Sequence, residues 1–231
     1  NESVTITFTG SEAITNFIIG DILTTGGLLS NFVKSTDTVY TASFTHTGTS
    51  VIIDINANSF SDLAGNENTQ AASQFEWTFD NIQPTISITA ANGSGEVFSG
   101  ASTNDNTLAL SFTVSEPTTN FVVGDISVVG GTISNFAASS TTLYTATLTP
   151  TAEGTLTIDV AATSFTDLTE NNNVVASQFS WIYDITKPNI TITASNGNEN
   201  ISDGSSTDDP FLLLTFSISE PTSDFSIEDV V

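Results

Sequence analysis

The sequence of 231 residues contains no cysteine, no methionine and no arginine, and it has only two lysines. Without cysteine there are no disulfides, thiol nucleophiles or thiolate metal sites, and cysteine usage indicates no redox compartment. The scarcity of cations, set against 26 Asp and Glu, gives a formal net charge of -24. Such a chain cannot neutralise phosphates, so nucleic acids and anionic membrane surfaces are excluded as partners.

Long apolar runs are also missing, because no stretch approaches the roughly 18 apolar residues that a membrane helix needs. The start, Asn1-Glu2-Ser3, is neither an initiator methionine nor a signal peptide. We therefore expect a soluble chain without direct membrane insertion. We also expect it to be an internal piece of a longer protein.

Groups suited to catalysis are scarce. A nucleophilic serine needs a base, and the one imidazole, His46, occupies a position that is Pro150 in the next copy of the repeat described below. Two carboxylates could hydrolyse a glycoside only if they faced one another across a cleft. The acids here fall mainly in turns or, like Asp54 and Asp159, between inward-facing apolar residues of strands. We expect no enzyme activity.

An internal repeat dominates the sequence. Ser11-Glu12 recurs as Ser115-Glu116 and again as Ser219-Glu220, at a constant step of 104 residues. A unit of this length can form its own core. Pro84 and Pro188 each precede an alternating run, and we place the boundaries there. The predicted domains are 1–83, a repeat lacking its first strand; 84–187, a complete repeat; and 188–231, the N-terminal part of a third.

The hydrophobic pattern indicates strands. Leu108, Leu110, Phe112 and Val114 alternate with small or polar residues, as in a strand with one buried face. No stretch shows a helical period, and Thr, Val, Ile, Phe and Tyr favour strands. About seven such runs per repeat predict an all-β protein of tandem immunoglobulin-like antiparallel β-sandwich repeats of about 104 residues. A closed barrel is the alternative.

Four segments of the middle repeat form a recognisable pattern: Ser115-Glu116-Pro117-Thr118-Thr119-Asn120-Phe121, Gly124-Asp125-Ile126-Ser127-Val128, Tyr144-Thr145-Ala146-Thr147-Leu148-Thr149-Pro150 and Ser164-Phe165-Thr166-Asp167. With them, the chain resembles a known family, the bacterial immunoglobulin-like repeats of large secreted cell-surface adhesins. The loop Asp62-Leu63-Ala64-Gly65-Asn66 matches the usual loop of that family, whereas the second repeat departs from it with Asp167-Leu168-Thr169-Glu170-Asn171. The resemblance implies a secreted, extracellular or cell-surface protein whose repeats mostly extend a stalk.

Acidic residues are expected to gather at the junctions between repeats. In a seven-strand sandwich the loop after the second strand and the loop before the last strand lie at one end, where the preceding linker arrives. Glu116 is in the first of these loops, Asp167 and Asn171 are in the second, and Asp80-Asn81 is the linker. Calcium prefers six to eight oxygen ligands, so this junction is a candidate calcium site.

The other junctions offer related sets. The next junction collects Asp184 and Glu220, with Asp105 near that end of the middle repeat, and the first repeat carries Glu12 and Asp62. The resemblance supports calcium, because related adhesin stalks carry such ions. The alternative is that these acids form turns and add solubilising charge. Lys187 also counts against a cation at the second junction.

We expect a non-catalytic structural stalk or filament segment, with neighbouring repeats of the same chain, and other copies in a filament, as partners. One alternative is a recognition module that binds a glycan or a protein through its loops or a strand edge. Another is an accessory domain of an extracellular enzyme. The ligand at the tip of the array, and the exchange of strands between chains, stay open.

Overall fold

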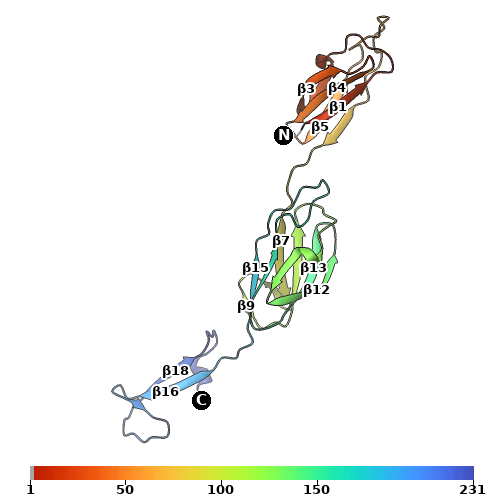
Figure 1. Cartoon of the computed structure of the whole chain (residues 1–231). Coiled ribbons are helices and arrows are strands. Elements are labelled where there is room, and N and C mark those ends of the chain that lie inside the picture. Colours follow the sequence, from red (N-terminus) through yellow and green to blue (C-terminus); the bar gives the residue numbers. More distant parts are fainter. Residues whose placement is uncertain (1–2) are drawn as a thin grey trace. The chain divides into compact units, whose positions relative to one another are not determined.

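The computed structural model describes residues 3–231, which form strands joined by turns and loops (Figure 1). The chain divides into two compact units. The first unit comprises the chain up to Pro84 together with Thr166–Asn173, and the second comprises Thr85–Phe165 and Val174–Val231. The all-β fold class predicted from the alternating pattern is confirmed.

The first unit contains two three-stranded sheets with the strand orders β1-β4-β3 and β2-β5-β6. All of their pairings are antiparallel. A single 3-10 turn, Ile19–Asp21, precedes β2. The strands are β1 (Val4–Thr9), β2 (Ile22–Thr25), β3 (Gly27–Lys34), β4 (Val39–His46), β5 (Ser50–Ile55) and β6 (Phe75–Thr78).

The second unit contains a complete sandwich. One sheet has the order β12-β13-β10-β7-β8 and the other has the order β11-β14-β15-β9. A 3-10 turn, Val123–Asp125, again precedes the first strand of the second sheet. The strands are β7 (Ile86–Asn92), β8 (Gly95–Val97), β9 (Ser102–Thr103), β10 (Leu108–Val114), β11 (Ile126–Val129), β12 (Gly131–Ala138), β13 (Leu143–Pro150), β14 (Gly154–Val160) and β15 (Phe179–Tyr183).

This sandwich has nine strands where seven were expected, because the segment between β7 and β10 adds two short ones. β8 pairs with β7, and β9 then crosses to the other sheet, where it runs parallel to β15. The crossing has a physical reason: the Thr103 hydroxyl accepts a hydrogen bond from the indole N–H of buried Trp181, at 3.0 Å. The sandwich is therefore antiparallel except at this edge.

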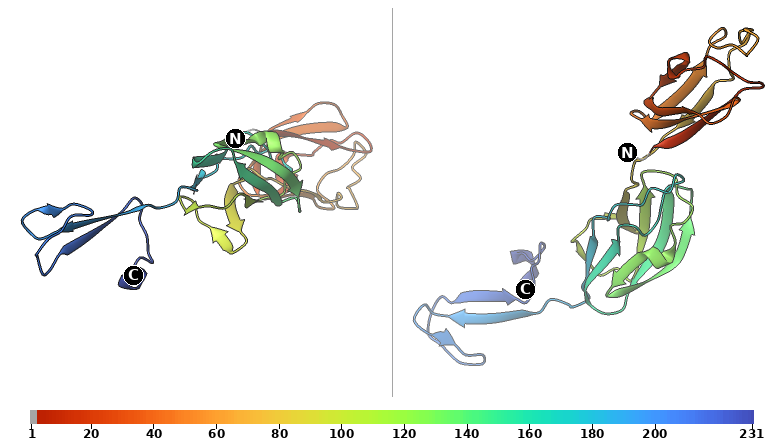
Figure 2. Two further views of the ribbon diagram at one scale, coloured as in Figure 1. Left: turned by 90° about the horizontal axis from the view of Figure 1, so that it is seen from below. Right: turned by 45° about the horizontal axis from the view of Figure 1, so that its top comes forward.

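The remaining part of the second unit, residues 188–231, forms a single sheet with the order β17-β16-β18 (Figure 2). Its strands are β16 (Ile190–Ser195), β17 (Asn200–Ile201) and β18 (Leu213–Ile218), and the 3-10 turn Ile227–Asp229 follows. These strands correspond to β7, β8 and β10 one repeat earlier. Because residues 188–231 supply no second sheet, inward-facing apolar side chains such as Ile192 and Leu214 stay exposed.

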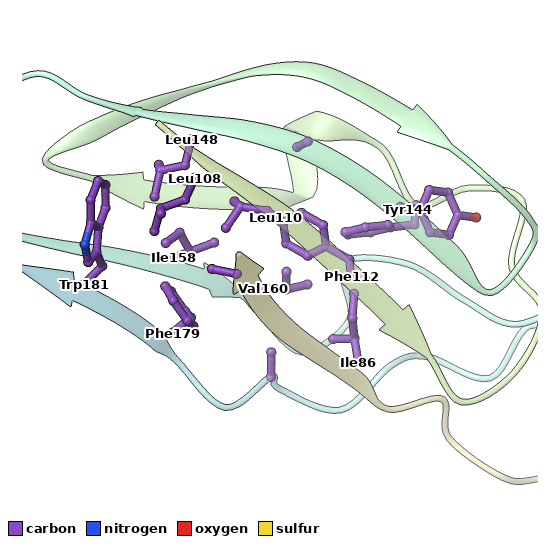
Figure 3. Close-up of a cluster of buried hydrophobic side chains, with 14 of the residues drawn as sticks. Ile86, Leu108, Leu110, Phe112, Tyr144, Leu148, Ile158, Val160, Phe179 and Trp181 are labelled. Atoms are coloured by element: carbon purple, nitrogen blue, oxygen red, sulfur yellow. The ribbon is translucent and has the colours of Figure 1, made fainter. Parts of the chain in front are cut away.

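The core of the complete sandwich follows the predicted alternation (Figure 3). β10 turns Leu108, Leu110 and Phe112 inward, and β14 turns Leu156, Ile158 and Val160 toward them. Full burial of a side chain of this size stabilises the fold by about 1.5–3 kcal/mol. Since the chain has no cysteine, this packing replaces the disulfide that holds many immunoglobulin domains.

An aromatic cluster is repeated in both sandwiches. Phe17 packs edge-on against Tyr40, with ring centroids 5.2 Å apart, and Phe121 packs in the same way against Tyr144, at 5.1 Å. The tyrosine hydroxyls donate to backbone carbonyls, Tyr40 to Ile14 at 3.1 Å and Tyr144 to Thr118 at 2.9 Å. Burial raises the pKa of Tyr144. These bonds tie the loop after β1 or β10 to the core.

Each sandwich also contains a pair of glycines where the chain passes from one sheet to the other. Gly130, between β11 and β12, has a φ of +77°, a conformation that favours glycine. A Cβ on Gly131 would lie 2.8 Å from a methyl of Leu156 and 2.9 Å from the carbonyl oxygen of Thr149. The pair is repeated at Gly26-Gly27 because the same crossing occurs between β2 and β3.

Replacing Phe112 by alanine should destabilise the complete sandwich by about 3–5 kcal/mol, because the ring is fully buried and leaves a cavity. Phe8 is the matched position of the first repeat and is only half-buried, so Phe8→Ala should cost less. Amide hydrogen exchange reports each repeat separately and measures both effects. Equal losses would contradict this account of the core.

Candidate functional site

The loop Thr166–Asn173 is organised by one carboxylate, that of Asp167. Its Oδ1 accepts hydrogen bonds from the backbone N–H of Thr169 and Asn171, at 2.8 and 2.9 Å, and from the Thr169 hydroxyl, at 2.9 Å. Its Oδ2 accepts from the side-chain amide of Asn171, at 2.9 Å. These bonds follow from the Asp-x-x-x-Asn spacing, because a turn of this length brings the backbone N–H and the side-chain amide of Asn171 back to the carboxylate of Asp167.

These bonds decide the ionisation of Asp167, whose side chain is buried. Burial alone would raise its pKa, since it disfavours the charged form. The hydrogen bonds from Asn171 and Thr169 outweigh burial and hold the pKa of Asp167 below its usual value. The group is therefore a carboxylate at neutral pH.

Asp80, from the segment after β6, lies on this loop within the first unit. Its Oδ2 is 3.2 Å from the hydroxyl of Thr169, and its backbone carbonyl accepts from the Asn171 amide at 3.3 Å. One carboxylate oxygen of Asp80 lies within 4.8 Å of one of Asp167. The linker and the loop named from the sequence thus come together at these two acids.

Thr169 cannot satisfy both carboxylates at once. Its hydroxyl has a single proton, yet its oxygen is within hydrogen-bond distance of both Asp80 and Asp167. One of the two contacts is therefore left without a hydrogen. Two like charges at this separation repel each other, and a cation between them would replace the missing proton.

Two further residues, Glu116 and Asn81, were named from the sequence for this junction. Glu116 follows the end of β10 in the second unit and is half-buried. Asn81 is exposed beside Asp80. The contacts between this segment and the loop Thr166–Asn173 are made by Asp80 and do not include the side chain of Asn81.

The second predicted set lies within the second unit, around a groove lined by Asp184 and Glu220 together with Glu153 and Thr186. Thr186 donates its hydroxyl to Glu153, at 2.5 Å, and its backbone N–H to Asp184, at 3.1 Å. The hydrogen bond from Thr186 lowers the pKa of Glu153. One carboxylate oxygen of Glu220 is buried without a hydrogen-bond partner among the described residues.

Glu153 was missed from the sequence. It lies in the short insertion where the 104-residue register slips, so it has no counterpart in the first repeat. The acidic residue directly before Gly154, at the start of β14, was the available signal.

The other three acids have local partners or lie exposed. Asp105 accepts hydrogen bonds from the Asn92 amide, at 2.8 Å, and from the Thr103 hydroxyl, at 2.7 Å, and these lower its pKa. Asp62 accepts from Asn66, which lowers its pKa likewise. Glu12 is exposed. Asp105 therefore fastens the segment between β7 and β10, and Asp62 fastens its own loop.

The ring of His46 lies against Phe79, with ring centroids 3.3 Å apart. This contact accounts for the one imidazole as a packing group near the end of β6. The expectation that His46 takes no part in catalysis stays a prediction.

The sheets, the duplicated aromatic cluster and the acidic loops define a tandem immunoglobulin-like repeat protein. A family model described as a bacterial Ig-like domain matches residues 1–79 and 80–182, and the chain belongs to this family. The resemblance drawn from the sequence is thereby confirmed. No curated protein matches the chain. The boundaries predicted at Pro84 and Pro188 stay predictions.

Bacterial Ig-like domains typically occur in extracellular or surface proteins and generally act as non-catalytic modules. The part of the chain that the structure describes has no helix long and apolar enough to cross a membrane.

Replacing Asp167 by asparagine should destabilise the protein by about 1–3 kcal/mol at neutral pH, because hydrogen bonds to a charged acceptor are lost. The folded-state pKa of Asp167 is lowered, so its contribution is present above the unfolded value of about 4 and disappears as pH falls through the folded value. Urea unfolding at several pH values measures this. Asp62→Asn, in the exposed counterpart loop, is the control with a smaller effect. A pH-independent loss would contradict the assignment.

Proposed function

We propose that the chain is a structural segment of a long extracellular repetitive protein of the adhesin type, serving as a stalk or filament and carrying out no covalent chemistry. One observation carries the proposal: the same sandwich core occurs twice, and only a short segment, from Thr78 to Ile86, separates the last strand of one copy from the first of the next. Such a chain gains length by adding repeats.

The acidic surface fits this role. A net charge of -24 with two lysines makes neighbouring arrays repel one another at the ionic strength outside cells, within a distance of about 10 Å. Repulsion at this range keeps stalks separate and soluble.

We further propose that calcium binds at the first junction. Asp80 and Asp167 would hold it with their carboxylates, and Asn171 and the Thr169 hydroxyl would add oxygen ligands. Glu116 is a further candidate ligand on the ground of its position in the sequence alone. Two observations support this fit. The hydroxyl proton of Thr169 can serve only one of the two carboxylates beside it, and all of the donor atoms are oxygens, which suit a hard cation. When bound, calcium would neutralise the clustered charge and fasten the linker to the loop.

The acids around the second groove, Asp184, Glu220 and Glu153, are candidates for the same function. Asp105, Asp62 and Glu12 are weaker candidates, because hydrogen bonds within their own loops use the first two and Glu12 is exposed.

A recognition role is the second candidate. The 3-10 turns that precede β2 and β11 each begin with an exposed apolar pair. The pair is Ile18-Ile19 in the first repeat and Val122-Val123 in the next. Exposed apolar side chains that recur in this way suit contact with a protein or a glycan. An accessory domain of an extracellular enzyme is a third reading, and the full-length sequence would separate it from the others.

Calcium should raise the unfolding temperature of the 231-residue chain, and a chelator should remove the rise, because a ligand that binds only the folded state stabilises it. At a thousandfold excess over Kd the gain is about 4 kcal/mol. Asp80→Asn and Glu116→Gln should each remove most of the shift. Asp54→Asn, which alters a half-buried carboxylate of β5 that accepts a hydrogen bond from Gln74, is the control.

An unchanged unfolding temperature with calcium would reject the calcium proposal and leave the stalk proposal standing. A shift that survives in Glu116→Gln would show that Glu116 is not a ligand.

The stalk proposal has its own test. Small-angle X-ray scattering of the chain in solution should give a maximum dimension close to that of repeats placed end to end. If calcium binds, it should narrow the distribution of distances, since the linker is then held. A maximum dimension of a single compact body would contradict a stalk.

A further inference from the structure

The hairpin that joins β7 to β8 contains a dipeptide whose chemistry the stalk function does not use, Asn92-Gly93. The nitrogen of a residue that follows asparagine can attack the side-chain amide of that asparagine. Glycine permits the closest approach, because it has no Cβ to obstruct it. The sequence has two asparagines followed directly by glycine, and the second, Asn196-Gly197, occupies the same place one repeat later. The same reactive dipeptide therefore recurs in two successive repeats.

In the folded chain the side chain of Asn92 is held by three hydrogen bonds. Its Nδ2 donates to Oδ2 of Asp105, at 2.8 Å. Its Oδ1 accepts from the backbone N–H groups of Ser94 and Gly95, at 2.8 and 3.0 Å. The two backbone bonds are local to the hairpin. The bond to Asp105 is different, because it ties the hairpin to the segment that leads into β10.

This bond continues toward the core. The Thr103 hydroxyl donates to the same Oδ2 of Asp105, at 2.7 Å, and its oxygen accepts from the indole N–H of buried Trp181, at 3.0 Å. Thr103 lies in β9, the short edge strand that pairs with β15. The side chains of Asn92, Asp105 and Thr103, here called the Asp105 network, therefore connect the β7–β8 hairpin with the edge strand β9.

The same network is built around Asn196. Its amide donates to Oδ2 of Asp209, at 2.8 Å, and the Thr207 hydroxyl donates to the same oxygen, at 2.6 Å. Its Oδ1 accepts from the backbone N–H groups of Asn198 and Glu199, both at 3.0 Å. An Asn-Gly dipeptide combined with a later Thr-x-Asp segment therefore produces these contacts in both places.

We propose that Asn92 and Asn196 are sites of spontaneous deamidation and that the modification opens the network around each of them. The Gly93 nitrogen gives up its proton and bonds to Cγ of Asn92, the Cγ–Nδ2 bond breaks, and Nδ2 leaves as ammonia with that proton. Water then adds to the cyclic imide and breaks one or the other of its carbon–nitrogen bonds. The products are aspartate or, where the backbone bond breaks, isoaspartate, and solvent water is the only co-reactant.

The Asp105 network opposes the first step. That step removes Nδ2 from Asn92, so it breaks the hydrogen bond between Nδ2 and Asp105. Because the bond stabilises the intact amide, the fold should slow deamidation relative to the unfolded chain. Gly93 itself is exposed, and the space beside its Cα is open, so the attacking nitrogen is accessible to solvent base.

The product cannot rebuild the network. A carboxylate at position 92 only accepts hydrogen bonds, so it cannot donate to Asp105 as the amide did. Two like charges would instead face each other across the former hydrogen bond. The edge strand β9 should therefore loosen. The change cannot be reversed by refolding, so it accumulates with the age of the chain. This inference goes beyond the stalk function and does not depend on calcium.

Peptide mass spectrometry of the 231-residue chain, incubated for weeks in chelator at mildly alkaline pH, tests the modification. Replacement of NH₂ by OH should appear at Asn92 and Asn196, and not at Asn135, which precedes a phenylalanine. Gly93→Ala should remove most of the modification at Asn92 and leave that at Asn196 unchanged. This variant should fold, because a Cβ on Gly93 meets no atom within 4 Å.

A second variant tests control by the network. Asp105→Ala removes the acceptor of the Asn92 amide and should speed modification at Asn92 about tenfold or more, since a hydrogen bond to a charged acceptor is lost. Asn196 in the same chain keeps Asp209 and is the internal control. Protection of the β10 amides from hydrogen exchange shows whether the variant is folded.

The structural consequence is tested with Asn92→Asp, which reproduces one product. The amides of Gly100 and Ile182, which donate to Ser180 and Ala101 along the β9 edge, should exchange faster. The amides of β10 should keep their protection. Asn135→Asp adds the same charge in β12, away from the Asp105 network, and should leave the β9 edge unchanged.

Any of four results would overturn the proposal. One is a folded chain unmodified at both sites after an incubation that modifies the chain fully in urea. Another is equal modification of Asn92 in Gly93→Ala and in the wild type. The others are an unchanged rate in Asp105→Ala, and an exchange pattern of Asn92→Asp identical to that of the wild type.

Discussion

The packing of two apolar sheet faces against each other is the interaction on which this molecule depends. No disulfide reinforces it, because the chain has no cysteine, and net charge opposes compaction. Stability must therefore come from alternate residues such as Leu110, Phe112 and Ile158, which are almost completely buried. Where a sheet lacks its partner, as in residues 188–231, the same kind of residue is left in water.

The alternation of β10, β13 and β14 could be predicted from the sequence because each presents one wet face and one buried face. β8 and β9 could not, since strands of three and two residues are too short to show a period. Their positions depend on distant partners, such as the indole of Trp181. The parallel pairing at that edge likewise has no local signal.

The candidate site was predictable in part. Asp167 and Asn171 could be named because their spacing is that of a self-bonded loop, and Asp80 because it precedes a proline-containing linker. The shared hydroxyl of Thr169 could not be foreseen, because it depends on the distance between two segments far apart in the chain. Glu153 could not be predicted from the repeat, because it lies where the 104-residue register slips and has no acidic counterpart in the first repeat.

The positions of the two tryptophans have an optical consequence. Trp77 and Trp181 are the only indoles in the sequence and occupy the same strand position in successive repeats. Trp181 is wholly buried with its N–H bonded to Thr103, whereas Trp77 is only half-buried. Their emission maxima should therefore differ, with the first repeat shifted to the red. Each sandwich therefore contains one intrinsic fluorophore, and the folding of either repeat can be followed without attaching a dye.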